Sequence, residues 1–296
     1  MTTPYRELSE PVRALAVAAA LPPDAYHPRG RWSLAGRRFA RYMPPLIAAG
    51  ALWSFVGPGL LGTGAVATAY LFMVVDLLRR RRLAFRLVRA SDEAVALLHG
   101  GDVDGAARCL DALAAEARGV GFYHALVVFN RGVAFVRQSE PEKALRLFDA
   151  VARSGWFERY RVMGFDGLLY TATASAHALL GDVPAAEQML ARAQARVGPA
   201  SRGKVLPSEA LVGLRRGEDR AVAARIDAEW SSAEGALPAT QLRALRALQA
   251  FALARSGADE AEVQRALERA RPVRAGELDH LGARWPALKD FLAARF

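Results

Sequence analysis

The chain has 296 residues, enough for one large domain or two modest ones, and its 25 glycines and 15 prolines are too few for wholesale disorder. Its single cysteine, Cys109, excludes an intrachain disulfide. The net charge of +10 suggests a nucleic-acid partner. However, residues 1–89 carry 13 arginines against four acidic residues, whereas residues 90–296 carry 27 basic and 26 acidic residues. The excess charge is confined to the N-terminal part, and we expect no nucleic-acid binding.

Residues 1–38 are expected to form an N-terminal cytoplasmic segment. The apolar stretch at 14–21 is similar to the core of a signal peptide, but the glutamates before it cancel the charge of the arginines there. The positive region that precedes such a core is therefore missing. A short amphipathic helix from Ser9 to Leu21 is the plainer interpretation.

Residues 44–75 form a run of 32 residues without a charged side chain. A single helix of that length would be about 48 Å long, whereas the hydrocarbon core of a bilayer is roughly 30 Å thick. The triplet Gly57-Pro58-Gly59 in its centre is a turn signal. We therefore predict a transmembrane helical hairpin over residues 39–78, with arms Phe39–Val56 and Gly59–Leu78 in contact with membrane lipid. A single kinked span, a re-entrant hairpin and a buried hairpin in a soluble protein are the alternatives.

Arginines flank this run on both sides. Five lie between Arg29 and Arg41, and six lie between Arg79 and Arg89. Positive residues stay on the cytoplasmic side of a membrane, so a hairpin would keep both ends of the chain in the cytoplasm. Residues 79–89 are interpreted as a basic juxtamembrane linker. The expected location is the bacterial inner (cytoplasmic) membrane, with the domain that follows on the cytoplasmic side.

Residues 90–296 have helical periodicity and lack the alternation that is typical of strands. Five turn signals align on Gly101, Ser139, Gly181, Gly217 and Gly257, at steps of 38, 42, 36 and 40 residues. In the first three copies an alanine follows the junction by five positions, and a larger apolar residue follows four positions later. This pattern predicts stacked helical hairpins. The predicted fold is therefore all-α, with the transmembrane hairpin followed by an α-solenoid of about five helical hairpins over residues 90–296.

The clearest copy, residues 125–151, resembles the tetratricopeptide repeat (TPR). Asn130, Gly132 and Phe135 fall on signature positions of the family's first helix, and Ala144 and Phe148 on those of its second helix. A copy at 167–199 matches several of the same positions, and the remaining copies match less well. The resemblance implies a concave face, lined by the first helices, that binds peptides. On that basis we expect partner contacts from Leu126, Phe129, Asn130, Val133, Arg137, Leu168, Thr171 and Ser175.

No pattern typical of catalysis or metal binding is present in the sequence. The five histidines are isolated from one another, Cys109 has no adjacent base, and "GPGLLGTG" lacks the Lys-Ser/Thr of a phosphate-binding loop. We therefore expect no enzymatic activity, metal or cofactor. The favoured function is a membrane-anchored TPR-like adaptor or scaffold that binds a protein or peptide partner at the cytoplasmic face of the membrane. The alternative is a non-catalytic subunit of a membrane transport or envelope-assembly complex.

Overall fold

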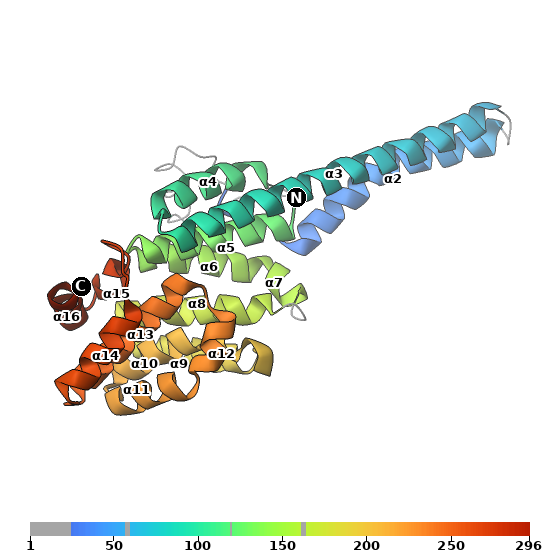
Figure 1. The fold of residues 1–296 in the computed structure, drawn as a ribbon. Coiled ribbons are helices and arrows are strands. Elements are labelled where there is room, and N and C mark those ends of the chain that lie inside the picture. The colour runs from blue at the N-terminus through green and yellow to red at the C-terminus, as the bar shows by residue number, and fades with distance from the viewer. Residues whose placement is uncertain (1–24, 57–59, 119, 161–163) are drawn as a thin grey trace.

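The computed structural model describes residues 25–56, 60–118, 120–160 and 164–296. All regular secondary structure within these residues is helical, as predicted. Figure 1 shows a long helical hairpin that projects from a body of stacked helices. The amphipathic helix expected at 9–21 and the turn expected at 57–59 lie outside the described residues.

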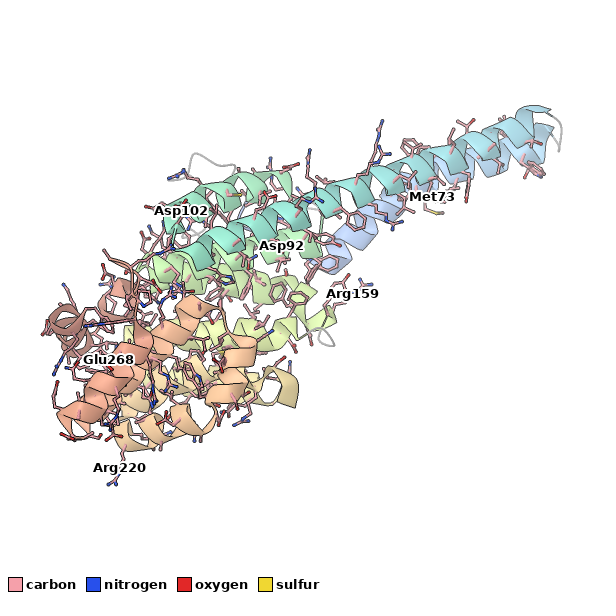
Figure 2. The ribbon with its side chains drawn as sticks, in the orientation of Figure 1. Met73, Asp92, Asp102, Arg159, Arg220 and Glu268 are labelled. Atoms are coloured by element: carbon pink, nitrogen blue, oxygen red, sulfur yellow. The ribbon has the colours of Figure 1, made fainter. Side chains whose placement is uncertain are left out.

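The projecting hairpin consists of α2 (Arg31–Val56) and the first part of α3 (Leu60–Gly100), which run antiparallel. With 41 residues, α3 is about 60 Å long. Around Met73 it has only α2 beside it, whereas around Asp92 it lies against α4 (Val103–Glu116) and α5 (Phe122–Arg137) (Figure 2). Residues 79–89, expected to be a linker, are continuous helix within α3, and Leu87 is already part of the core of the body.

The predicted transmembrane hairpin over residues 39–78 is wrong. Among the residues that the structure describes, no helix combines the length and the apolarity needed to cross a bilayer. In α2 the apolar stretch begins only after Arg41 and contains two prolines, and in α3 it ends at Asp76, 16 residues after Leu60. A crossing needs about 20 apolar residues in one helix. The uncharged run of the sequence is long only because it joins two shorter stretches on separate helices.

The body is α-solenoid-like and is built from helix pairs (Figure 1). The last part of α3 pairs with α4, and α5 pairs with α6 (Pro141–Ser154). The following pairs are α8 (Phe165–Leu180) with α9 (Val183–Gln194), α10 (Leu206–Arg216) with α11 (Asp219–Ala228), and α13 (Ala239–Arg255) with α14 (Glu260–Ala270). Short elements fill the connections and the C-terminal end: α7 (Trp156–Arg159), the 3₁₀ helix η2 (Pro199–Lys204), α12 (Trp230–Ala236), α15 (Asp279–Gly282) and α16 (Pro286–Arg295).

The five aligned junction residues share one backbone conformation. The angle φ is +90° at Gly101, +64° at Ser139, +84° at Gly181, +79° at Gly217 and +73° at Gly257. A left-handed residue ends a helix by turning the chain so that its last carbonyls find new donors. Ser139 is the one non-glycine residue with positive φ in the described part of the chain. The repeat register predicted from these junctions is therefore confirmed.

Small residues let the two helices of a pair approach closely. Ala106, Ala144 and Ala186, each five positions after a junction, are completely buried. A Cβ atom at Gly132 of α5 would lie only 2.5 Å from the ring of Phe148 in α6. The ring of Phe148 fills the space that a side chain at position 132 would need, which explains why a glycine lies opposite a phenylalanine at this contact.

Two residues that precede the hairpin, Tyr26 and Arg29, form hydrogen bonds with the body. Tyr26 is 1% exposed, and its hydroxyl donates a hydrogen bond of 2.6 Å to Asp111 on α4. The same carboxylate accepts a hydrogen bond of 2.7 Å from Arg131 on α5. The indole nitrogen of Trp156 donates to the carbonyl oxygen of Arg29 at 2.8 Å. Both ends of the hairpin are therefore held by the body.

Candidate functional site

Two of the polar residues predicted to contact a partner, Asn130 and Ser175, join neighbouring first helices, whereas the hydroxyl of Thr171 donates to the carbonyl oxygen of Gly167 in its own helix at 2.8 Å. The side-chain amide of Asn130 on α5 donates a hydrogen bond of 3.0 Å to the hydroxyl of Ser91 on α3. The hydroxyls of Ser175 on α8 and Ser208 on α10 lie 2.7 Å apart, and that of Ser208 also donates to the carbonyl oxygen of Thr171 at 3.0 Å. These groups therefore hold the layer of first helices together.

The apolar residues of the predicted site lie at the edge of the core. Phe129 is 8% exposed, and its ring centroid lies 5.6 Å from that of Phe148. Leu126, Val133 and Leu168 are half-buried and pack against the N-terminal core. The last three keep part of their apolar surface accessible on the adjacent helices α5 and α8.

Arg137, also predicted to contact a partner, points into the body. One of its guanidinium nitrogens lies 3.3 Å from Nε2 of His280, and another donates to the hydroxyl of Thr240 at 3.4 Å. Burial lowers the pKa of Arg137. Burial and the nearby guanidinium together lower the pKa of His280 well below its usual range, so that its ring is neutral and can accept a hydrogen bond from Arg137. This side chain therefore ties α5 to α13 and α15.

The C-terminal part of the chain folds back onto the first repeat. Arg274 donates a hydrogen bond to the carbonyl oxygen of Gly100 at the end of α3. Beside it, Arg243 of α13 forms an ion pair of 2.7 Å with Glu277, whose side chain is 4% exposed. Contacts between residues more than 100 positions apart thus join the C-terminal part of the chain to the C-terminal ends of α3 and α5.

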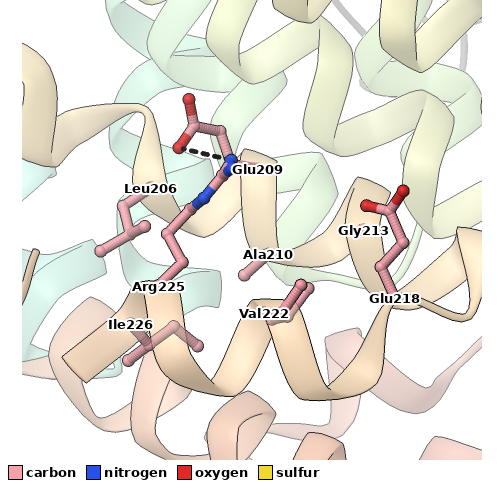
Figure 3. Close-up of a pocket in the computed structure, with 9 residues that line it drawn as sticks. Leu206, Glu209, Ala210, Gly213, Glu218, Val222, Arg225 and Ile226 are labelled. Carbon is pink, nitrogen blue, oxygen red and sulfur yellow. Dashed lines mark ion pairs between the residues drawn. The ribbon is translucent and has the colours of Figure 1, made fainter. Parts of the chain in front are cut away.

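A small crevice between α10 and α11 contains a buried carboxylate (Figure 3). The side chain of Glu209 is 2% exposed, accepts a hydrogen bond of 2.6 Å from Gln194, and lies 3.8 Å from Arg225. Its partners come from α9 and α11, and Arg202 of η2 lies 3.9 Å away, so the carboxylate links α10 to these three neighbours. Glu209 is not among the predicted site residues, although an acidic residue within the apolar pattern of Leu206–Arg216 indicates a buried carboxylate.

Among the described residues we find neither a cluster of metal ligands nor an activated thiol. No three side chains of His, Cys, Asp or Glu among them lie together as metal ligands would. Burial and the neighbouring Glu93 raise the pKa of the Cys109 thiol, which disfavours the nucleophilic thiolate.

Compared with known proteins, the chain matches no family model, no curated sequence and no solved structure. The resemblance to the TPR therefore depends on the sequence positions alone.

Proposed function

We propose that the protein is a TPR-like adaptor whose helical repeats bind a polypeptide partner through the first helices of the central pairs. The observation that supports this most directly is the regular stacking of helix pairs at left-handed junctions. Stacked repeats of this kind present their first helices as one extended surface, which repeat proteins use for binding.

The surface on α5 and α8 suits an amphipathic helix or an apolar peptide. Leu126 and Leu168 lie in the N-terminal halves of these helices and remain partly accessible, whereas the C-terminal end at Arg137 is covered by α13 and α15. An apolar groove selects partners with apolar residues at helical spacing. The nearly neutral charge of residues 90–296 favours a polypeptide over a nucleic acid.

Site-specific photo-crosslinking in cells tests this proposal. A photoreactive amino acid is placed in the full-length protein at Leu126 or Leu168, and in matched controls at Arg108 or Arg146. The control positions are exposed on the second helices α4 and α6. We expect a discrete polypeptide adduct from both first-helix positions and none from the controls.

The partner recovered from the adduct should then bind the purified protein, and Leu168→Glu should weaken that binding. Adducts of equal yield at all four positions, or no adduct at the first-helix positions, would contradict a partner-binding surface on α5 and α8.

A further inference from the structure

The outer surface of the projecting hairpin is apolar on several sides. Tyr70, Leu71 and Phe72 of α3 are 62%, 62% and 47% exposed. Because successive residues of a helix differ by about 100° in direction, these three cover roughly 200° of its circumference. On α2, Ile47 is 61% and Phe55 90% exposed. A helix that docks into a protein groove needs one apolar face, whereas apolar residues all round suit a surrounding apolar medium.

This exposed apolar surface is concentrated in the hairpin. Among the described residues, the large exposed hydrophobic side chains outside residues 46–85 are Leu97 and Phe296. Contiguous apolar surface of this extent on a folded protein indicates an interaction site.

Exposed cations of α3 lie at the base of the apolar surface. Arg79, Arg81 and Arg82, which we call the arginine collar, are exposed on α3 directly after the apolar stretch. The acid nearest to the collar, Asp76, is already engaged in a 2.7 Å ion pair with Arg80. The collar therefore presents its charge to an outside partner, and the negative headgroups of a lipid surface are complementary to it.

The length of the apolar stretch sets the depth that it reaches. From Leu60 to the arginine collar, α3 extends about 28 Å along the helix axis. This is about twice the roughly 15 Å of one leaflet's hydrocarbon layer. With the arginine collar at the headgroups, the hairpin therefore stays within one leaflet when it is tilted by about 60° from the membrane normal.

From this arrangement we propose that the hairpin inserts into one leaflet of an anionic membrane, from one side and without crossing it. The apolar side chains of α2 and α3 contact acyl chains, and the arginine collar contacts headgroups. Because Tyr26 and Leu87 anchor both ends of the hairpin in the core, insertion also fixes how the body is oriented at the membrane surface. This inference is independent of the partner proposed for α5 and α8.

Flotation of the full-length protein with lipid vesicles tests the inference. One set of vesicles contains equal parts of phosphatidylcholine and phosphatidylglycerol, and the other contains phosphatidylcholine alone. We expect flotation with the anionic vesicles and weaker flotation with the neutral ones. Replacing the three arginines of the collar by glutamine should abolish that difference.

The apolar contact is tested by Phe55→Glu combined with Leu71→Glu. Because charged side chains enter hydrocarbon at a large cost, we expect the bound fraction to fall by about tenfold or more. Leu97→Glu is the matched control, since Leu97 is 38% exposed on the same helix but beside the body, and it should float like the unmodified protein. Circular dichroism verifies that all variants remain helical.

Two results would overturn the inference. One is flotation that the glutamates at 55 and 71 leave unchanged. The other is a protein that fails to float and instead forms a dimer that the same glutamates dissociate, which would make a second copy of the chain the occupant of this surface.

Discussion

The hairpin and the body use the same kinds of residue in opposite ways. Leu87 of α3 is 1% exposed, whereas Leu77, ten residues earlier on the same helix, is 64% exposed. The difference lies in the neighbours, because α4 and α5 pack on α3 around Asp92, whereas only α2 lies beside it around Met73 (Figure 2). Apolar composition therefore does not determine burial; the number of helices available to cover a face does.

The arginines of the two regions also differ in how deeply they are buried. In the body, Asp111 is shared by Tyr26 and Arg131, and the side chain of Arg131 is 8% exposed. In the hairpin, Asp76 is 12% exposed and accepts hydrogen bonds from Tyr42 and Arg80, but the side chain of Arg80 is 32% exposed and remains near solvent. The guanidinium of Arg131 is thus more deeply buried than that of Arg80.

Removing one acid from each region should give the largest contrast. Asp111→Ala leaves the guanidinium of Arg131 buried without its carboxylate, and we expect a loss of about 3 kcal/mol in the free energy of unfolding. Asp76→Ala should cost about 1 kcal/mol or less, because Arg80 then turns to water. Denaturant unfolding of both variants measures the difference. Equal losses would mean that the two pairs are equally buried, contrary to this comparison.

Adding one methyl group to a glycine of each region should destabilise the body but not the hairpin. Gly132→Ala forces a Cβ atom against the ring of Phe148, and we expect a destabilisation of about 2 kcal/mol. Gly50 of α2 has no atom within 4 Å of an added Cβ. Gly50→Ala should therefore leave stability unchanged or raise it by up to about 1 kcal/mol through helix propensity. Thermal unfolding compares them, and a destabilising Gly50→Ala would show that the hairpin surface is covered.

A buried histidine of the body, His280, should make the stability of the protein depend on pH. Because burial and Arg137 lower the pKa of His280 in the folded protein, the unfolded chain binds a proton more readily. Stability should then fall as the pH drops below the unfolded value of about 6.5, by about 1.4 kcal/mol per pH unit until the folded pKa is reached. His280→Gln should reduce this slope, while His99, whose pKa is lowered in the same direction by burial, stays in both proteins. Unchanged slopes in unfolding experiments from about pH 7.5 to about pH 5 would contradict this assignment.

The junctions of the repeats should give the smallest effect. Ser139→Gly removes the steric cost of a left-handed residue with a side chain, and we expect a gain of about 0.5–1 kcal/mol. Gly181→Ser makes the reverse change at the next junction and should cost a similar amount. If Ser139→Gly destabilises the protein, its side chain has a role that the backbone conformation does not explain.

Local features of the body were predictable from the sequence. A glycine such as Gly101 indicates a left-handed junction, and an alanine such as Ala144 indicates close helix packing. Both features depend on a few adjacent residues. The contact between Arg137 and Thr240 is different, since it joins residues 103 positions apart. The sequence pattern correctly placed Arg137 on a first helix but contained no signal that α13 would return to cover it.

The error about the membrane has a physical cause as well. The two predicted arms, Phe39–Val56 and Gly59–Leu78, include Arg41 and Asp76, and the apolar stretch that remains in each helix is shorter than the length that each helix needs to span a bilayer. The same pattern also gave no indication that α3 continues through 79–89 into the body, where Leu87 is buried. For the candidate site, the sequence identified the helices of the predicted surface. It did not indicate which side chains on them would instead bond to neighbouring helices.

Thiol labelling of single cysteines along α3 tests the contrast between the two regions most directly. In a Cys109→Ser background, cysteine replaces Leu71, Leu87 or Leu97. We predict that the cysteines at 71 and 97 react rapidly in solution and that the cysteine at 87 is protected. Anionic vesicles should then protect position 71 alone. A cysteine at 87 that reacts as fast as the one at 71 in the folded protein would contradict the account that α3 is buried in the body and exposed in the hairpin.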